Sequence, residues 1–307
     1  MHTQNTQLKV MVTGATGGLG SKLVPFLQAA DWCAGVVAVD RDRQVLAERF
    51  AMLSKVERRT IDLSAPDMGF VASAFQGVDA IVHFAILNPL PDSSWTEAAY
   101  SFDMTARLLL LARDQGLQRF VFTSSNHALG NYGQEPLRHA IVSGGLTTEL
   151  FAPGSKWDTA AGEITGYAYG AGKIFGERLC LAAAQRDGLS TVAVRIGWCQ
   201  AGENHPSTLD ASGNPNLAAL GRTPRDDPAE LRWFRNMWLS NRDFLHLMER
   251  ALLADADAWP SPGIVVNGMS ANRGMGWDID TARRTIGYLP QDNVWDSVLD
   301  EEAFIGG

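Results

Sequence analysis

Tyr169 and Lys173 form a Tyr-x-x-x-Lys pair, whose side-chain types point to proton transfer. On a helix, residues four apart lie on one face, so we expect the Lys173 ammonium beside the Tyr169 phenol. A positive charge there lowers the pKa of a phenol and lets it exchange protons near neutral pH. Alternatively, Tyr169 is an ordinary half-buried tyrosine beside a solvated lysine, since the spacing can arise by chance among five tyrosines.

A glycine-rich segment follows the first predicted strand, with Gly14, Gly17 and Gly20 spaced three apart. Without Cβ atoms, the backbone turns tightly and can approach a pyrophosphate, whose charge is met by N–H groups at the start of the next helix. The strand before the segment and the helix after it match a dinucleotide-binding fingerprint. The residues predicted to bind the cofactor here are Gly14, Thr16, Gly17, Gly18, Leu19 and Gly20.

Asp40 ends the second predicted strand, twenty residues beyond Gly20. Its carboxylate can accept hydrogen bonds from an adenosine ribose diol and would repel a 2′-phosphate, which favours NAD over NADP. Arg41 and Arg43 temper this preference, and the alternative for Asp40 is a solvated carboxylate. We expect Asp62 beside adenine and Ala85 beside the ribose. The further predicted cofactor contacts are Arg41, Asp62, Leu63, Ala85, Tyr169, Lys173 and Ile196.

Short β-branched runs alternate with longer helical patterns over the first 200 residues, which predicts βαβ units and a parallel sheet. The predicted strands are Leu8–Thr13, Val36–Asp40, Thr60–Asp62, Ala80–Ala85, Arg119–Ser124, Thr191–Ile196 and Ile264–Asn267. The predicted helices are Gly20–Ala30, Gly69–Phe75, Trp95–Gln115, Tyr167–Asp187, Asn241–Ala254 and Asp278–Ile286.

The predicted fold class is α/β, a Rossmann-like doubly wound parallel sheet with a small C-terminal substrate-binding region. Residues 1–197 form the NAD-binding domain and residues 198–307 the substrate-binding region. The Pro-, Gly-, Asn- and Asp-rich segment 200–230 is predicted to be a loop or lid, and segment 130–166 is predicted to be irregular. We expect both to line the substrate pocket, because loops beyond the carboxyl ends of parallel strands form the crevice of such folds.

Composition restricts the function classes. The chain has 307 residues, is 46% hydrophobic and carries a net charge of -8, which argues against a nucleic-acid or anionic-membrane partner. It shows no signal-like N-terminus and no run near the roughly 18 apolar residues of a membrane span, so we expect a cytoplasmic protein. Cys33, Cys180 and Cys199 are expected to be reduced, and the six histidines show no metal-site spacing, so we expect no metal.

Thr123-Ser124-Ser125-Asn126-His127 ends the fifth predicted strand, where a parallel sheet presents its ligand. With Tyr169 and Lys173, this segment resembles the extended, epimerase-like branch of the short-chain dehydrogenase/reductase superfamily, and the resemblance covers nearly the whole chain. It implies that Ser125, rather than Ser124, orients the reacting oxygen. It also implies that Tyr169 exchanges the proton and that Lys173 holds the nicotinamide ribose.

A narrower resemblance is to uronate dehydrogenases and related sugar dehydrogenases. It is carried by Ser124 to Gly130, Val194 to Gly197, Trp238 to Ser240 with Asp243-Phe244, and Ser270 to Arg273 with Trp277-Asp278. The resemblance implies NAD-dependent oxidation of the ring C1 hydroxyl of an aldose to a lactone, with Tyr169 as general base. It also implies that Asn126 and His127 hold sugar hydroxyls. A core or capping role is the alternative for His127.

Departures from that family concern the substrate pocket. Trp198 stands where uronate dehydrogenases usually have a small hydroxyl residue, and Arg232 and Arg235 are out of register with their carboxylate-binding arginine. The pocket is therefore predicted to be remodelled, for an anionic sugar with a carboxylate, sulfonate or phosphate at C6. Solvated helix positions are the alternative for the two arginines. The predicted substrate contacts are Asn88, Ser125, Asn126, His127, Trp198, Arg232 and Arg235; Arg195 is either a further site residue or a structural ion-pair partner.

Helices Trp95–Gln115 and Tyr167–Asp187 resemble the pair with which extended members of the superfamily form dimers, so we expect a homodimer. The alternative is that their apolar faces only cover the sheet. Two competing functions remain open from the sequence. One is a nucleotide-sugar epimerase or dehydratase with tightly bound NAD, and the other is a non-catalytic NAD-binding protein.

Overall fold

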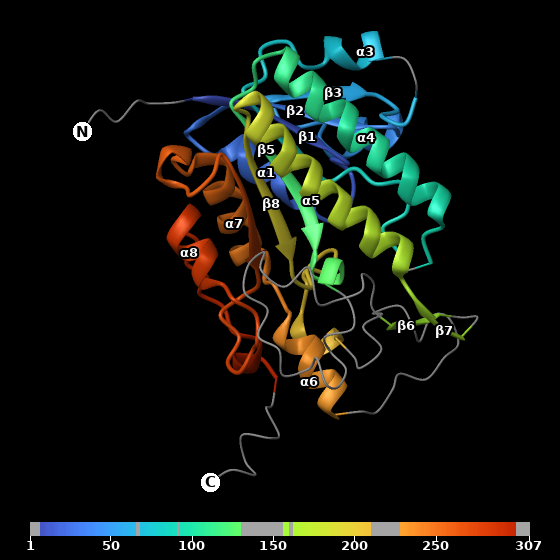
Figure 1. Cartoon of the computed structure of the whole chain (residues 1–307), viewed down its shortest axis with the longest axis vertical. Helices are drawn as coiled ribbons and strands as arrows, with labels where there is room; N and C mark the ends of the chain where they lie inside the picture. The colour runs from blue at the N-terminus through green and yellow to red at the C-terminus, as the bar shows by residue number, and fades with distance from the viewer. Residues whose placement is uncertain are drawn as a thin grey trace.

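Seven strands form one parallel sheet in the order β3-β2-β1-β4-β5-β8-β9 (Figure 1). The computed structural model describes residues 7–65, 68–90, 92–129, 156–159, 162–209 and 228–298. The strand order reverses between β1 and β4, so the predicted doubly wound, Rossmann-like fold is confirmed. The strands are β1 (Leu8–Thr13), β2 (Cys33–Asp40), β3 (Val56–Thr60), β4 (Ala80–His83), β5 (Arg119–Ser125), β8 (Ser190–Ile196) and β9 (Gly263–Gly268).

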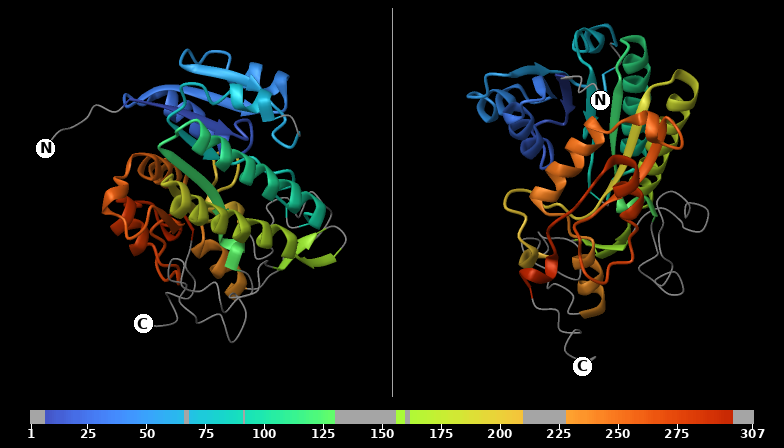
Figure 2. Two further views of the ribbon diagram at one scale, coloured as in Figure 1. Left: turned by 45° about the horizontal axis from the view of Figure 1, so that its top comes forward. Right: turned by 90° about the vertical axis from the view of Figure 1, so that its left-hand side faces the viewer.

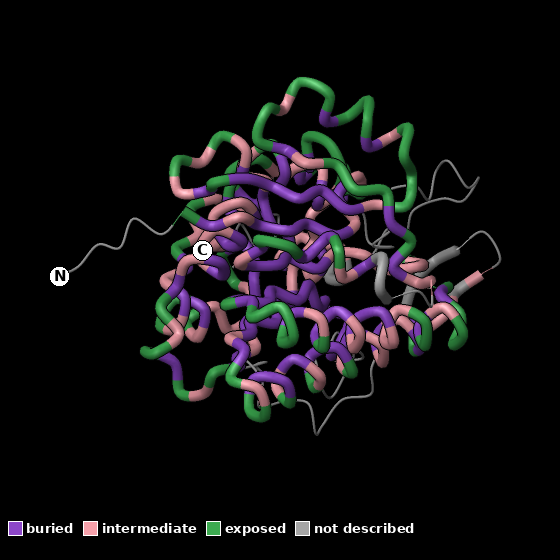
Figure 3. The backbone as a smooth tube through the Cα atoms, turned by 90° about the horizontal axis from the view of Figure 1, so that it is seen from above, coloured by how far each residue is buried: buried purple, intermediate pink, exposed green. Residues whose placement is uncertain are grey.

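Helices cover both faces of the sheet, as the two views of Figure 2 show. On one face pack α1 (Gly20–Ala29), α2 (Arg43–Arg49), α7 (Asn241–Leu253) and α8 (Asp280–Ile286). On the other pack α3 (Met68–Ser73), α4 (Trp95–Asp114) and α5 (Tyr167–Asp187). The central strands are buried from both sides (Figure 3), which explains their nearly continuous apolar sequences. Val10 and Val12 face one core and Met11 the other, as strand alternation requires.

Side chains cap the starts of α4 and α7. The Ser94 hydroxyl accepts from the Glu97 backbone N–H while the Glu97 carboxylate accepts from the Ser94 N–H, a capping box that starts α4. At α7, the Ser240 hydroxyl accepts from the Asp243 N–H. These caps satisfy N–H groups that have no partner within the helix.

Three sequence predictions are corrected by the structure, and one helix was missed. The third strand is Val56–Thr60, not Thr60–Asp62, because this edge strand buries only Val56 and lacks an apolar run. Helix α2 was not predicted, although Asp42 caps it by accepting from the Val45 N–H. The segment predicted to be irregular contains an antiparallel hairpin, β6 (Lys156–Thr159) and β7 (Gly162–Thr165), and the predicted loop 200–230 ends inside α6 (Pro228–Asn236).

The chain after residue 197 continues the same sheet. Strand β9 pairs with β8, and α7 and α8 share the core of α1. Trp198 forms an isolated bridge with Trp238, which ties the end of β8 to the segment after α6. Residues 130–155, 160–161 and 210–227 of the two predicted insertions lie outside the described residues. No described helix has both the length and the apolar character to cross a bilayer.

Candidate active site

A cavity of about 490 Å³ lies at the carboxyl ends of β1 to β4. Gly14 turns there with φ at +65°, and a Cβ on it would lie 2.9 Å from the Ala85 backbone nitrogen, so only glycine fits. No side chain caps the start of α1, which leaves that helix terminus to a ligand anion. The predicted cofactor contacts that line the cavity are Gly14, Thr16, Gly17, Gly18, Leu19, Gly20, Asp40, Arg41, Asp62, Leu63 and Ala85.

The Asp40 carboxylate is positioned by the glycine-rich segment. Its Oδ2 accepts from the Thr16 backbone N–H at 2.9 Å and from the Thr16 hydroxyl at 2.7 Å, and its Oδ1 accepts from the Arg41 N–H at 2.8 Å. The Arg49 guanidinium donates to the Thr16 carbonyl at 2.7 Å and so ties α2 to this turn. The residues at this end suit the adenosine ribose and pyrophosphate of a dinucleotide.

His83 connects the glycine-rich segment to α4 through a buried chain of hydrogen bonds. The Thr13 hydroxyl accepts from the Ala85 N–H and lies 2.7 Å from His83 Nδ1, and His83 Nε2 lies 3.1 Å from the Thr105 hydroxyl. The Thr105 hydroxyl donates to the Ser101 carbonyl, so His83 carries its proton on Nε2 and accepts from Thr13 at Nδ1. Burial lowers the pKa of His83 to about 3, which agrees with a neutral ring.

Ser125, Tyr169 and Lys173 meet at the neighbouring end of β5. The Ser125 hydroxyl lies close enough to the Tyr169 phenol to lower its pKa. The Lys173 ammonium is buried, donates to the Thr123 carbonyl at 2.7 Å and lies 5.6 Å from the centre of the Tyr169 ring. The structure thus brings together the three predicted catalytic side chains, at the same edge of the sheet as the cavity.

The pKa of Tyr169 is raised, mainly by burial, although the Ser125 hydroxyl lowers it in part. The expected net lowering of this pKa is therefore wrong for the free protein. The reason is that desolvation of the phenolate is the largest influence on it. Burial also lowers the pKa of Lys173 to about 8, while the Glu177 carboxylate raises it.

An aromatic wall stands beside the phenol. The ring of His127 packs edge-on against Tyr169 with centroids 6.3 Å apart and against Trp198 at 6.5 Å, and Trp198 packs on Phe234 at 5.6 Å. The Asn126 amide donates to the Met237 sulfur at 2.7 Å. Burial lowers the pKa of His127 to about 4, so the ring is neutral at physiological pH. Of the predicted substrate contacts, Ser125, Asn126, His127 and Trp198 thus lie together around Tyr169.

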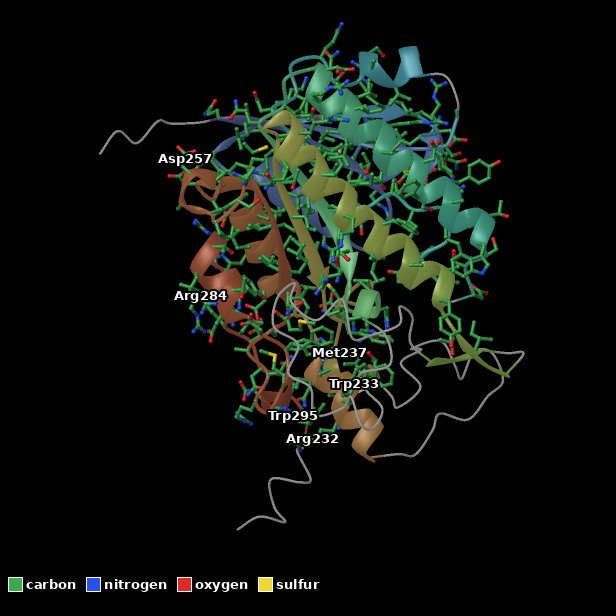
Figure 4. The ribbon with its side chains drawn as sticks, viewed as in Figure 1. Arg232, Trp233, Met237, Asp257, Arg284 and Trp295 are labelled. Atoms are coloured by element: carbon green, nitrogen blue, oxygen red, sulfur yellow. The ribbon has the colours of Figure 1, made fainter. Side chains whose placement is uncertain are left out.

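The other predicted substrate contacts lie in other surroundings. The Asn88 amide points to the carboxylates of Asp92 and Glu97 at the start of α4, at 3.3 and 3.5 Å. The Arg232 guanidinium of α6 stacks over Trp295 at 5.2 Å, and Figure 4 shows the two labelled side by side. Arg235 is half-buried in the last turn of α6. Ile196, a predicted cofactor contact, packs against the core at the end of β8.

Several site residues were missed by sequence reasoning. The cavity is also lined by apolar residues that no motif marks: Val39, Val45, Ile61, Phe84, Ile86, Leu87, Pro89 and Met104. His83 had a signal, since it is a polar residue at the end of an apolar strand. Glu177 had a stronger one, because it follows Lys173 at the spacing that joins Tyr169 to Lys173. No group of three or more His, Cys, Asp or Glu in the described part of the chain is arranged to hold a metal.

The comparisons with known proteins agree with this geometry. Over 288 residues the chain is 29% identical to the NAD-dependent glucose-6-phosphate dehydrogenase of Haloferax volcanii, covering 92% of this chain and 93% of the relative. It is 29% identical over 290 residues to the L-arabinose 1-dehydrogenase (NAD(P)(+)) of the same organism, covering 93% and 97%. The crystal structure of a glucuronic acid dehydrogenase from Chromohalobacter salexigens matches with a TM-score of 0.68 and 26% identity, over 98% of this chain and 90% of that one.

Residues 10–209 match the model of the NAD dependent epimerase/dehydratase family. This match confirms NAD as the cofactor, and the glucuronic acid dehydrogenase confirms the resemblance to uronate dehydrogenases. Because the family model spans more than half of the sequence, the chain belongs to the NAD-dependent epimerase/dehydratase family.

Proposed function

We propose that this protein is an NAD-dependent sugar dehydrogenase that oxidises the ring C1 hydroxyl of an aldose to the lactone. The observation that carries the proposal is the meeting of Ser125, Tyr169 and Lys173 at the sheet edge that also holds the dinucleotide cavity. The relatives support it, since the glucose-6-phosphate, arabinose and glucuronic acid enzymes are all named as sugar dehydrogenases.

In this reaction, Tyr169 acts as its phenolate and accepts the proton of the C1 hydroxyl as C1 loses a hydride. NAD supplies the hydride acceptor. Ser125, which lies beside the phenol, orients the substrate oxygen. The neutral rings of His127 and Trp198 form a wall of the site. The Lys173 ammonium offsets the charge of the phenolate, whose formation burial opposes. A positioned general base of this kind contributes about 10²- to 10⁴-fold to the rate.

The proposed substrate carries an anionic group at C6: a carboxylate, a sulfonate or a phosphate. Glucose 6-phosphate and glucuronic acid, named for two of the relatives, share this feature, whereas arabinose lacks it. Arg232 and Arg235 of α6 are the proposed partners of the anion. Trp198, held in place by backbone hydrogen bonds to Met237 and Leu239, is proposed to contact the sugar.

A substrate panel tests this choice. The purified protein is incubated with NAD and with glucuronate, glucose 6-phosphate, a 6-sulfo sugar, glucose or arabinose, and NADH formation is followed by its absorbance. We expect kcat/KM for at least one anionic sugar to exceed that for the neutral sugars by at least about tenfold, the value of one charged contact. A preference for a neutral sugar would contradict the anionic group. Conversion of a nucleotide sugar without net NADH formation would instead favour an epimerase.

We also propose that the chain forms a homodimer through α4 and α5, which lie side by side on one face of the sheet (Figure 1). Several large apolar side chains of the two helices are exposed, and Phe102 packs on Phe175 with centroids 5.2 Å apart. The exposed residues are Trp95, Tyr100, Leu110, Tyr167 and Phe175. Light scattering of the wild type should give a dimer, and Phe175→Asp should shift it to a monomer; a monomeric wild type would contradict this.

A further inference from the structure

Glu177 lies on the same stripe of α5 as Tyr169 and Lys173, since the three residues are spaced four apart. Its carboxylate accepts two hydrogen bonds from Arg195, at 2.8 Å from Nε and 2.7 Å from Nη2. The Ser124 hydroxyl donates to the same carboxylate at 2.6 Å. The side chains of Arg195 and Glu177 are 0% and 2% exposed, so this is a fully buried ion pair with a hydroxyl attached.

The pair joins the three elements that carry the candidate active site. Ser124 belongs to β5, Glu177 to α5 and Arg195 to β8. Each is close in sequence to a site residue, so a shift of any of these side chains moves the site. These neighbouring site residues are Ser125 after Ser124, Lys173 one turn before Glu177, and Trp198 three residues after Arg195.

The buried charges around Lys173 leave one net positive charge, because Lys173 and Arg195 are positive and Glu177 is negative. In the described residues, the other titratable groups that face them from the packed elements are Tyr169 and Cys180 of α5, His83 of β4 and, behind Tyr169, His127. Burial holds both histidines neutral and raises the pKa of the thiol and the phenol, so none supplies a compensating charge at neutral pH. Among these described groups, Glu177 therefore supplies the negative charge that offsets one of the two positive charges.

We propose that Glu177 and Arg195 act as a positioning pair for the candidate active site, which aligns α5 with β5 and β8 and sets how firmly Lys173 keeps its proton. The kinetic consequence rests on the proposed dehydrogenase function, since Lys173 must stay charged to support the phenolate. The charge balance itself is a property of the free protein and can be measured without turnover.

The two single variants should shift the titration of Lys173 in opposite directions. Glu177→Gln removes the negative charge between two cations, so the Lys173 midpoint should fall by about one pH unit or more. Arg195→Met removes the competing cation, so Glu177 acts on Lys173 alone and the midpoint should rise by a similar amount. The double variant restores one net positive charge and should return the midpoint to within about half a unit of the wild type. Glu177→Asp keeps the charge and should do the same.

The midpoints are measured by NMR of the free protein labelled with ¹³C at lysine Cε. The chain has five lysines, so the Lys173 signal is assigned by its loss in Lys173→Met. The wild-type midpoint is expected at about 8. The matched control is Asp243→Asn, which alters another buried carboxylate, one that accepts from Ser270 and from the Gln291 N–H. It should lower stability without moving the Lys173 midpoint.

Opposite shifts in the single variants, with recovery in the double variant, support the positioning pair. Unchanged midpoints, or shifts of both single variants in one direction, would overturn it. If Glu177→Gln does not fold, Arg195→Met and the double variant decide the question, because the double variant removes both members of the buried pair. If the midpoints of the wild type and variants behave as expected but the wild type forms no NADH with any sugar, the proposed function is contradicted and this inference still holds.

Discussion

Gly176 sets how closely α5 approaches the sheet, and its replacement by alanine tests whether that approach positions the catalytic side chains. A Cβ at Gly176 would lie 2.5 Å from Cε1 and 2.9 Å from Cε2 of Phe122, against an ordinary contact of 3.4–4 Å. The Phe122 ring cannot yield freely, because it is 4% exposed and packed between His83 and Lys173. Relief of the overlap therefore moves α5 by about 1 Å, since the core is closely packed.

Gly172→Ala, on the same helix, is the matched control. Its Cβ would meet Ala98 at 3.7 Å, an ordinary contact. Both alanines gain about 1 kcal/mol of helix propensity, and only Gly176→Ala carries an overpacking cost of about 1–3 kcal/mol. Urea denaturation should therefore place Gly176→Ala about 1–3 kcal/mol below Gly172→Ala in free energy of unfolding.

The displacement should also reduce turnover, because α5 carries Tyr169 and Lys173. A shift of about 1 Å in catalytic groups costs on the order of 100-fold in rate, so kcat of Gly176→Ala should fall by that factor, while Gly172→Ala stays within a few-fold of the wild type. Equal stabilities and equal kcat values for the two variants would refute the argument that contact between Gly176 and Phe122 sets the position of the site.

Three further predictions concern His83, the choice of cofactor and the contact of Trp198 with the substrate. The pKa of His83 is lowered from 6.5 to about 3, mainly by burial, so the unfolded state alone gains this proton between those values and stability falls as pH falls through that window. In urea denaturation, His83→Asn should reduce the slope of unfolding free energy against pH in this window by about 1.4 kcal/mol per pH unit. An unchanged slope would contradict a neutral buried His83. Asp40→Ala should reduce the ratio of kcat/KM for NAD to that for NADP by about 10- to 100-fold, the value of hydrogen bonds to a charged group, and an unchanged ratio would mean that another residue sets cofactor choice. Trp198→Ser should change the ranking of sugars by kcat/KM while KM for NAD stays within about twofold; a proportional loss on all sugars would argue against contact between the indole and the substrate.

Features that a short stretch of sequence encodes were predictable. The glycine-rich turn and Asp40 lie within one βαβ unit, and Tyr169 and Lys173 lie on one helix. Their relative positions therefore follow from local sequence. The long helices were predicted within one or two residues of their ends, since Ser94 and Gly188 mark the boundaries. The parallel sheet followed from the alternation of strands and helices.

Features that depend on packing between distant segments were not predictable. The Arg195 side chain could be assigned as an ion-pair partner or a site residue only after β8 and α5 were placed together. The stacking of Arg232 on Trp295 joins α6 to a segment about 60 residues later in the chain, and no local sequence pattern indicates this contact. The direction of the Tyr169 pKa shift was wrong for the same reason, because the cost of burying the phenolate depends on everything packed around it.

The central claim is that Tyr169 transfers the proton in an NAD-dependent sugar oxidation. The most direct test measures NADH formation by wild type and Tyr169→Phe on the best sugar of the panel, with NAD binding measured in parallel by calorimetry. Turnover should fall by about 10²- to 10⁴-fold in the variant, while its Kd for NAD stays within a few-fold of the wild type. Turnover near the wild-type rate in Tyr169→Phe would contradict the account.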